Sequence, residues 1–390
     1  MYRINRYTLK HDNNREERGK EIANHNQVRR IDEHHYKVKS QSRNLEHDVI
    51  STESGLICDC EDHIYRKICC KHIHAVEFSV KIRKEVKERN NVVIEQIDCS
   101  KCIECQSINI VKHGIRRNKS GDIQRFSCKD CGKWFVFNIG FEGMRVNPKA
   151  ITSAMQLYFT GESLRNVQQF LKLQGVNVSH QTVYNWIKKY TKLMSGYLEK
   201  ITPQVGDTWR SDELFLKISG NMKYMYALLD DETRYIIAQQ VGNTKYKENI
   251  NELFREGKKV AGKKPKVLIT DGAMNFQQAY MKEFWARPLE QRTEHIRHIH
   301  FKNDMNNNKM ERLNGEIRDR EKTMRGLKKM DTPILKGYEI FHNYVRPHMG
   351  LDGKTPSEAC GIKVEGDNKW ITLIQNAQMS REFTRRTVSQ

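Results

Sequence analysis

The chain lacks any long apolar run. No stretch of about 18 consecutive apolar residues occurs among its 390 residues, which excludes a membrane-spanning helix. The opening MYRINRYTLK also lacks the apolar core of a signal peptide. We therefore expect a soluble intracellular protein without a membrane partner, and a chain of this length predicts about two to four domains.

Acidic residues are also in short supply. There are 48 Asp and Glu against 68 Lys and Arg, which gives a net charge of +20 and a pI near 9.4. Such a surplus of basic residues indicates a polyanionic partner, and nucleic acid is the first candidate. Basic residues kept only for solubility are the alternative.

Cysteine is nearly absent outside one part of the chain, since nine of the ten lie between Cys58 and Cys131. In a reducing cell this grouping favours zinc over disulfide bonds. The first group supplies four ligands suited to a tetrahedral zinc site: Cys58, Cys60, Cys70 and His72. The spacing resembles the SWIM zinc finger, in which Cys-x-Cys precedes Cys-x-His, and CKHIHAVEF resembles the closing helix of that family. Cys69 leaves the third ligand ambiguous, and we expect His74 on the helix surface.

A second group of cysteines forms two Cys-x-x-Cys knuckles: Cys102, Cys105, Cys128 and Cys131. Two strand-like runs separate the knuckles and turn at residues 119–121. Paired knuckles on a hairpin resemble a zinc ribbon. Cys99 could substitute as a ligand, although the first pair of knuckle cysteines gives the better register.

Residues 148–190 contain three helical segments, KAITSAMQLYFTG, ESLRNVQQFLKLQG and SHQTVYNWIKKY. Ser163 and Ser179 are the expected caps of the second and third segments. This spacing predicts a helix-turn-helix whose third segment is the recognition helix, with Val183 and Ile187 facing inward. A three-helix bundle used for packing or dimerisation is the alternative.

Two regions supply the expected DNA contacts. With Val183 and Ile187 facing inward, five other side chains of the recognition helix are expected near bases or phosphates: Ser179, His180, Gln181, Tyr184 and Asn185. On the ribbon hairpin the contacts would come from Arg116 and Arg117, and aromatic residues follow the last knuckle. Basic residues interleaved with aromatic ones suit nucleic acid, and a solvated hairpin face is the alternative.

After residue 203 the pattern changes from helices to strands. WRSDELFLKI, MKYMYALLD and RYIIAQQV predict an antiparallel meander, and KVLIT predicts a short buried strand. Helices are expected over about residues 245–260 and 274–284, and a short strand HIHF leads into a helix over residues 301–327. This order predicts an RNase H-like α/β layer with a mixed five-stranded sheet.

Three carboxylates stand where this layer could bring them together. Asp212 shares the strand parity of Leu214 and Leu216, so it lies on the covered face, where an unpaired charge is costly. Asp271 ends KVLIT, and Glu311 lies on the following helix. Three carboxylates suffice to hold two magnesium ions about 4 Å apart, the arrangement used in phosphoryl transfer. No covalent nucleophile with a neighbouring base stands out, so in-line attack is expected.

The same motifs resemble the DDE transposases of bacterial and archaeal insertion sequences over about residues 205–362. The segments concerned are DEL with LLD, LITDGA, NNNKMERLNGEIRDREKTMRG and NYVRPHMGLDGKTPSEACGI. The resemblance implies that Asp212, Asp271 and Glu311 are catalytic ligands of Mg²⁺ or Mn²⁺. It also implies that Arg318, seven positions after the glutamate, can hold a DNA phosphate.

Other acids compete with these three. Glu316 and Glu321 lie on the same helix but lack the surrounding asparagines. Glu213 faces the opposite side of its strand, and Asp230 and Asp231 lie in a turn. A purely structural role as caps or surface charges is the alternative for all three chosen acids.

A further helix is expected to begin at Pro333 and to end near Arg346 and His348. The resemblance implies that these two residues support the active site or contact DNA, and the sequence itself favours packing roles equally. TPSEA predicts a capped turn. Beyond Ile362 the periodicity is lost, and we expect the end of the chain to be frayed.

Seven parts are therefore expected along the chain. They are a polar segment, a SWIM-type finger, a linker helix, a zinc ribbon, a helix-turn-helix domain, an RNase H-like catalytic domain and a tail, at residues 1–34, 35–80, 81–97, 98–138, 147–192, 203–362 and 363–390.

Together the motifs predict a DNA transposase of an insertion sequence, cytoplasmic and associated with the prokaryotic nucleoid. It would bind terminal repeats through the ribbon and the helix-turn-helix, and cut and join double-stranded DNA at a two-metal site. Two structural zinc ions and a homodimer or larger assembly on DNA complete the expectation. A transposase-derived DNA-binding regulator without catalysis and an RNase H-like nuclease are the alternatives.

Overall fold

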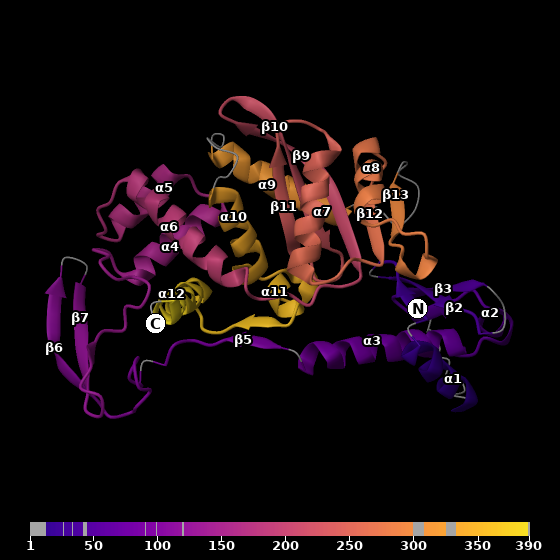
Figure 1. Cartoon of the computed structure of the whole chain (residues 1–390), viewed down its shortest axis with the longest axis horizontal. Coiled ribbons are helices and arrows are strands. Elements are labelled where there is room, and N and C mark those ends of the chain that lie inside the picture. Colours follow the sequence, from indigo (N-terminus) through magenta and orange to yellow (C-terminus); the bar gives the residue numbers. More distant parts are fainter. Residues whose placement is uncertain are drawn as a thin grey trace, which may run out of the picture.

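The computed structural model describes the chain at residues 13–25, 27–32, 34–41, 45–89, 91–98, 100–118, 121–298, 308–324 and 333–388. An N-terminal module and a β-hairpin lie at opposite ends of the long axis, with a three-helix bundle and a large sheet between them (Figure 1). Among the described helices, none is both long and apolar enough to cross a membrane.

The N-terminal module packs a four-stranded antiparallel sheet, in the order β1-β2-β3-β4, against helices. Its elements are α1 (Asn13–Asn24), β1 (Val28–Arg30), β2 (His35–Lys39), β3 (Glu46–Thr52), β4 (Gly55–Cys58), α2 (Glu61–Arg66) and α3 (Lys71–Arg89). The sheet begins ahead of the boundary expected at residue 35. Helix α3 runs unbroken to Arg89, so the segment expected to start a separate linker helix at residue 81 instead continues the closing helix of this module.

A three-stranded antiparallel sheet forms the hairpin at the other end. Its strands are β6 (Ile110–Asn118), β7 (Gly121–Cys128) and β8 (Trp134–Phe135). The segment that leads to it contains β5 (Val92–Ile94), which pairs in parallel with β14 (Ile362–Val364) from the far end of the chain. The expected turn at residues 119–121 lies mostly outside the described residues.

Three helices follow as predicted: α4 (Pro148–Thr160), α5 (Leu164–Leu173) and α6 (His180–Leu198). The hydroxyl oxygens of Ser163 and Ser179 accept hydrogen bonds from backbone N–H groups three residues later, which confirms both caps. Val183 and Ile187 are fully buried, as expected. Helix α6 continues beyond Tyr190, where the expected segment ended, because Met194 and Leu198 extend its buried stripe.

The large sheet has five strands in the order β11-β10-β9-β12-β13. They are β9 (Thr208–Ile218), β10 (Asn221–Asp230), β11 (Ile236–Gly242), β12 (Val267–Asp271) and β13 (Glu294–His298). The first three are antiparallel, whereas β12 runs parallel to both β9 and β13, which confirms the mixed five-stranded sheet. The strand expected at residues 298–301 was placed too late, since β13 ends at His298 and residues 299–301 lie outside the described part.

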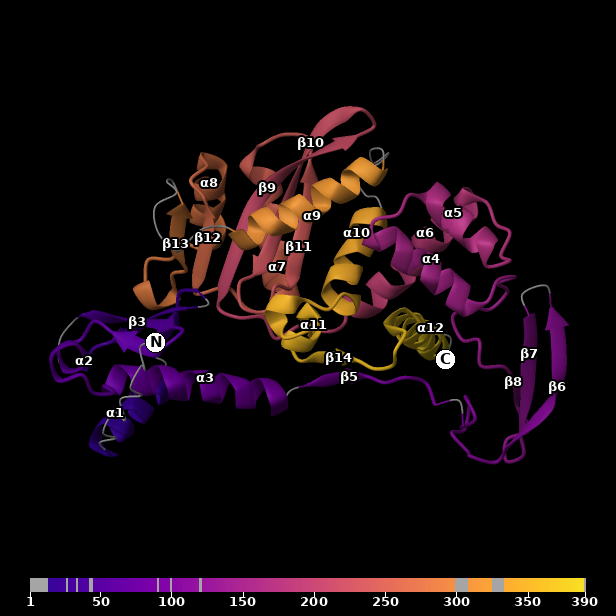
Figure 2. The same cartoon turned by 180° about the vertical axis from the view of Figure 1, so that it is seen from behind.

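Helices cover both faces of this sheet (Figures 1 and 2). On one face lie α7 (Lys247–Ala261) and α8 (Met274–Glu283), and on the other lie α9 (Asn308–Met324) and α10 (Pro333–Ile340). Helix α9 buries Met310, Leu313 and Ile317, as its sequence predicts. The remainder of the helix expected over residues 301–327 falls outside the described residues.

Short elements and one long helix complete the chain. They are η1 (Leu289–Gln291), η2 (Phe341–Val345), η3 (Met349–Leu351), α11 (Pro356–Ala359) and α12 (Lys369–Val388). Thr355 and Glu358 form a capping box at α11, which confirms the capped turn. The expected loss of periodicity beyond Ile362 was wrong, because α12 runs through most of the segment expected to be frayed, as far as Val388. Buried Trp370, Leu373 and Ile374 line one side of α12, which packs against α4 and α6.

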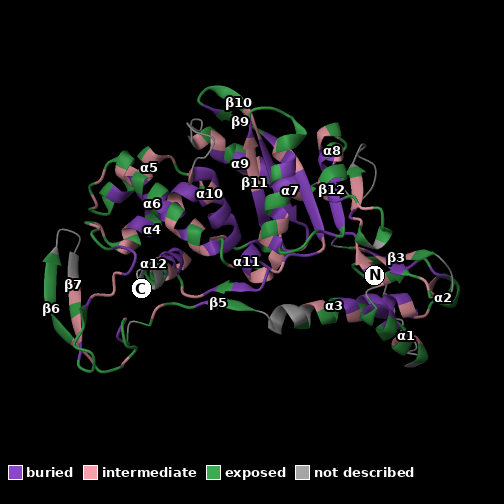
Figure 3. Cartoon of the chain, viewed as in Figure 1, coloured by how far each residue is buried: buried purple, intermediate pink, exposed green. Residues whose placement is uncertain are grey.

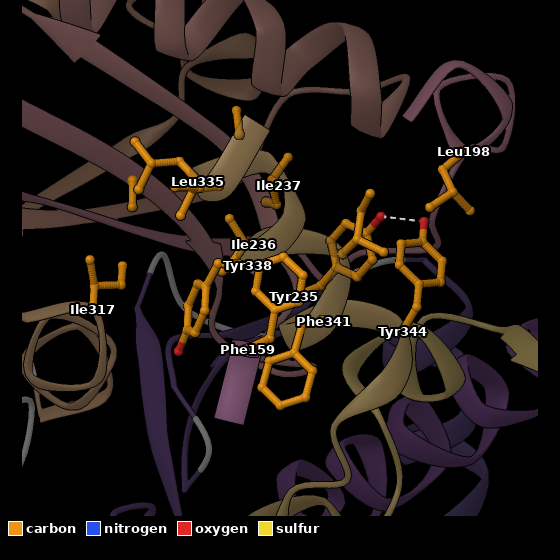
Figure 4. Close-up of a cluster of buried hydrophobic side chains, with 14 of the residues drawn as sticks. Phe159, Leu198, Tyr235, Ile236, Ile237, Ile317, Leu335, Tyr338, Phe341 and Tyr344 are labelled. Carbon is orange, nitrogen blue, oxygen red and sulfur yellow. Dashed lines mark hydrogen bonds between the residues drawn. The ribbon is translucent and has the colours of Figure 1, made fainter. Parts of the chain in front are cut away.

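One core joins the helical bundle to the sheet. Around α10 and η2, Phe159 from α4 and Leu198 from α6 lie among residues of β11 (Figure 4). The hydroxyls of Tyr235 and Tyr344 are 2.7 Å apart within it. The orientation of the bundle relative to the sheet is therefore fixed by buried packing.

The N-terminal module also contacts the sheet, through the end of β1. Ile31 packs against Val267 and Ile269 of β12. The Arg30 guanidinium lies 2.8 Å from a Glu232 carboxylate oxygen, and the Thr208 hydroxyl donates to the Arg30 carbonyl over 3.0 Å. The module is thus docked on the sheet by both apolar and charged contacts.

Candidate active site

The register of two parallel strands brings the two candidate aspartates together. Ser211 of β9 pairs with Thr270 of β12. Asp212 and Asp271 each follow by one residue, so they continue the same register on neighbouring strands, which lie about 4.8 Å apart. Residues that directly follow a pair in parallel strands share one face of the sheet.

Helix α9 crosses that face. The side-chain amide of Asn314 donates a hydrogen bond of 2.9 Å to Oδ2 of Asp212, which anchors the helix over the first strand. Glu311 lies three residues earlier on α9 and is exposed, while Asn314 is buried. Residues three apart on a helix share a side, so Glu311 extends from the side of α9 that carries Asn314.

The electrostatics of Asp212 indicate that the three carboxylates interact. The pKa of Asp212 is raised to about 6, mainly by burial and in addition by the charges of Asp271, Glu213 and Glu311, while a hydrogen bond from the Glu213 N–H acts in the lowering direction. Burial also raises the pKa of Asp271. A cation bound among these groups would relieve both the burial cost and the repulsion.

The spacing of the carboxylates bears on how many ions they could share. In the described parts of the chain, the groups of three or more ligand residues whose atoms all lie within 4.8 Å of one another each contain cysteine. The oxygens of the three acids are therefore spread more widely than a single small ion requires.

The rival acids on α9 are occupied elsewhere. The Arg346 guanidinium donates two hydrogen bonds, of 2.6 and 3.0 Å, to Glu316, which also accepts one from the Tyr338 hydroxyl. Glu321 accepts a hydrogen bond from the backbone N–H of Lys217. Arg346 thereby ties the segment after α10 to α9, the kind of support that the sequence resemblance implied for it. His348 packs its ring 4.6 Å from that of His342.

The rival acids on the sheet also have structural partners. Asp230 is buried and accepts hydrogen bonds from the backbone N–H groups of Gly206 and Thr233. Asp231 is paired with Arg210 and Lys309.

Glu213 forms an ion pair with Lys245. Burial raises the pKa of Asp271 overall, and the charge of Lys245 opposes part of that rise, so this lysine belongs to the surroundings of the acids. Sequence reasoning missed it because nothing in its local pattern distinguishes it from other surface lysines.

Both predicted cysteine clusters form in the structure. The groups Cys58, Cys60, Cys70 and His72, and Cys102, Cys105, Cys128 and Cys131, each have all their ligand atoms within 4.8 Å of one another. Sulfur atoms of the second cluster lie 3.6 and 3.7 Å apart, close to the separation of two thiolates on one tetrahedral zinc. The donor sets and spacing therefore fit Zn²⁺. Cys99 lies outside the described residues.

The structure distinguishes the two adjacent cysteines and differs from expectation at His74. Cys70 belongs to the first cluster, whereas Cys69 points away from it toward His74, with Sγ 3.9 Å from Nδ1. His74 was expected on the surface, but only 2% of it is exposed. The face of α3 that carries His74 was expected to be exposed to solvent, but α1 packs along α3 and covers it.

The residues expected to contact DNA lie on the surface, with one exception. Ser179, His180, Gln181 and Asn185 are exposed at the start of α6, and Tyr184 is half-buried. The Ser179 hydroxyl is engaged as the helix cap, and Gln181 donates to Asn185 over 3.1 Å. Arg116 and Arg117 are exposed on β6, as is Arg318 on α9.

Comparisons with known proteins point to one kind of domain. Residues 206–348 match a family model described as a DDE domain. Over 154 residues the chain is 29% identical to the transposase for insertion sequence-like element IS431mec of Staphylococcus aureus. It is 26% identical over 172 residues to an uncharacterized 48.3 kDa protein of insertion element ISM1 of Methanobrevibacter smithii.

These matches are partial in length. The staphylococcal match covers 38% of this chain and 66% of the relative, and the archaeal match covers 40% and 41%. Among solved structures, the catalytic core domain of HTLV-2 integrase in complex with magnesium is 17% identical, with 41% of this chain and 98% of that chain covered and a TM-score of 0.31.

Proposed function

We propose that this chain, whose residues 206–348 form a DDE domain of the insertion-sequence transposase type, cleaves and joins DNA ends. One observation of the structure carries the proposal: parallel pairing sets Asp212 beside Asp271 under the helix that bears Glu311. The transposase name of the staphylococcal relatives supports the same reaction class.

In this proposal the three acids are ligands of divalent ions. Mg²⁺ or Mn²⁺ held by Asp212, Asp271 and Glu311 would activate the attacking oxygen and stabilise the leaving oxygen of a phosphodiester. The protein itself supplies hard oxygen ligands and keeps them in place. Asn314 orients Asp212 by its hydrogen bond, and Arg346 holds α9 through Glu316.

DNA would be positioned by basic and polar side chains around this site. Arg318 lies on α9 two turns beyond Glu311, within reach of a phosphate next to the one that reacts. Recognition of the terminal repeats would fall to the start of α6, inserted in a major groove, and to Arg116 and Arg117 of the hairpin. The shared core of the bundle and the sheet would keep the bound repeat at a fixed distance from the acids.

Zinc and self-association complete the proposal. The two four-ligand cysteine clusters would each hold a structural Zn²⁺, in a SWIM-type finger and a zinc ribbon. Joining requires two DNA ends at once, so the active form would be a homodimer or larger assembly on DNA, at the nucleoid.

The test uses purified full-length protein and DNA carrying the ends of its own element, with Mg²⁺ or Mn²⁺. Asp271→Asn and Glu311→Gln should each abolish cleavage and joining, a loss of at least about a thousandfold, because each removes a charged ligand. Binding of the same DNA should be unchanged. The control is Asp319→Asn, which removes an exposed acid from the same helix and should keep wild-type activity.

The possible outcomes separate the alternatives. Normal joining by Asp271→Asn would refute the assignment of the acids. Metal-dependent cleavage by the wild type without joining would indicate a nuclease. Specific binding of the element ends without any cleavage would indicate a DNA-binding regulator.

A further inference from the structure

Three ligand-type side chains converge at the start of α3, outside the four-ligand cluster. The Sγ of Cys69, a ring nitrogen of His74 and a carboxylate oxygen of Glu77 all lie within 4.8 Å of one another. Cys69 and His74 are buried, whereas Glu77 is exposed. The active site uses none of them.

The separations match those of a metal site. The Sγ of Cys69 is 3.9 Å from Nδ1 of His74, and Oε2 of Glu77 is 3.2 Å from the same nitrogen. In the neighbouring four-ligand cluster, the sulfur atoms of Cys58 and Cys70 are 3.8 and 3.9 Å from Nδ1 of His72. Ligands bound at 2.0–2.3 Å to one tetrahedral zinc are roughly 3.3–3.8 Å apart, so the separations in both clusters fall within or about 0.1 Å outside this range.

The local sequence explains how two ligand sets fit side by side. Cys69 and Cys70 are adjacent at the end of a loop, and one of them enters each set. His72 and His74 are two residues apart at the start of α3, so they project from different sides of the helix. Glu77 lies one turn after His74 and returns to its side.

Hydrogen bonding satisfies these two contacts unequally. If Nδ1 of His74 carries a proton, it donates to Glu77, and the Cys69 sulfur can share that hydrogen only as a weak acceptor. If Nδ1 is unprotonated, it can accept from the thiol but then faces the carboxylate oxygen lone pair to lone pair. A divalent cation satisfies sulfur, nitrogen and oxygen together.

We propose that Cys69, His74 and Glu77 bind a further divalent cation of the zinc class, with a fourth position open to water. The cation would fasten the loop before α3 to the first turns of that helix. It would lie beside α1, which comes so close that a Cβ on Gly19 would stand 2.5 Å from Cβ of His74.

This site should be weaker than the four-ligand cluster beside it. It has one protein ligand fewer, and its carboxylate is exposed to water. We therefore expect a cation that exchanges under mild chelation while the four-ligand clusters keep theirs.

The experiment counts zinc in the full chain by elemental analysis during titration with zinc alone. The wild type should bind one equivalent more than Cys69→Ser, and mild chelation should remove that equivalent first. Glu77→Gln should weaken the same equivalent by at least about tenfold, since even indirect partners of metal sites change affinity by 10- to 100-fold. Glu85→Gln, an exposed acid two turns further along α3, is the matched control and should match the wild type.

A second readout separates the site from a general loss of structure. With cobalt(II) in place of zinc, the weakest equivalent should show sulfur-to-metal absorption in the wild type and lose it in Cys69→Ser. Because Glu77 is exposed, Glu77→Gln should fold even if Cys69→Ser does not. Equal zinc content in the wild type, Cys69→Ser and Glu77→Gln at saturating metal would overturn the proposal.

Discussion

The ligand atoms of the cysteine clusters lie closer together than the carboxylates of the large sheet. In each four-ligand cluster, every ligand atom lies within 4.8 Å of the others, whereas Asp212, Asp271 and Glu311 do not meet that limit. Neutral thiols and an imidazole can approach one another without a metal. Carboxylates repel, and burial has already raised the pKa of Asp212 to about 6.

The two sets also differ in what surrounds them. Strand β6 is largely exposed and the described part of β7 is mostly half-buried (Figure 3), and the buried cluster of the hairpin consists of Cys102, Cys128 and Phe135 with a few partly buried neighbours. In contrast, Asp212 and Asp271 lie on the sheet and Glu311 on α9, and these elements share a large apolar core to which the acids do not belong. We infer that metal ligation supports the fold at the cysteines, whereas the burial and mutual repulsion of the acids reduce stability.

The largest effect is expected at the hairpin. Cys128→Ser should remove one zinc per chain and unfold β6 to β8, because so small a core cannot replace apparent zinc-binding energies of about 10–16 kcal/mol. Hydrogen exchange should show the hairpin amides unprotected while the amides of β9 to β12 stay protected. Cys70→Ser is the comparison, since the N-terminal module has a larger core and rests on the sheet. If the hairpin amides of Cys128→Ser stay protected from hydrogen exchange without zinc, then zinc does not support the fold of the hairpin.

Removing an acid should stabilise the fold, whereas removing a cysteine ligand should destabilise it. In the absence of divalent ions, Asp212→Asn should raise the free energy of unfolding at pH 7 by about 1–3 kcal/mol, since one pKa unit is worth 1.36 kcal/mol. The melting temperature should rise by a few degrees, and cleavage should be lost. Asp319→Asn, on the exposed side of α9, should change neither. A melting temperature that falls in Asp212→Asn would mean that the acid supports the fold.

The same stabilisation should depend on pH. The pKa of Asp212 is about 6 in the folded protein and near 3.8 in the unfolded chain. Between pH 3.8 and pH 6 the folded state therefore holds one more proton on this group than the unfolded state. The wild type therefore regains stability from this group as pH falls through 6, and loses it as pH rises. The gap in melting temperature between Asp212→Asn and the wild type should shrink from pH 7 to pH 5. Asp207 and Glu316 have lowered pKa values, so their contributions to stability fall as the pH falls. They are present in both proteins, so these contributions cancel in the difference in melting temperature.

The contrast explains what the sequence could reveal. Cysteine ligands are close in the chain, so their spacing alone predicted which residues converge in both clusters. Strand parity and strand ends singled out Asp212 and Asp271, which neighbouring strands place side by side and whose catalytic role stays a prediction. The partner contacts of the acids were beyond reach because they join distant segments, as Arg346 joins Glu316 and Lys245 joins Glu213.

Two misses had different causes. The buried stripe of α12, with Trp370, Leu373, Ile374 and Ala377, follows helical spacing, so its signal was present but was outweighed by the polar end of the segment. His74 carried no such signal. Its burial depends on α1, a polar helix that packs along α3 only once the module has folded.

The smallest effect is expected from Asn314, a neutral side chain that donates a hydrogen bond to Asp212. Asn314→Ala removes the hydrogen bond to the charged form of Asp212, so the pKa of that carboxylate should rise further. A hydrogen bond to a charged group contributes about 1.5–3 kcal/mol, of which water entering the space would restore part, so the shift should be about one pKa unit or less. The pH at which Mn²⁺ binding is half-maximal, measured calorimetrically, should rise by that amount. Asp319→Asn provides the unshifted profile. If both profiles coincide, the acids are tuned by burial and by one another alone, and the asparagine serves only to seat α9 on the sheet.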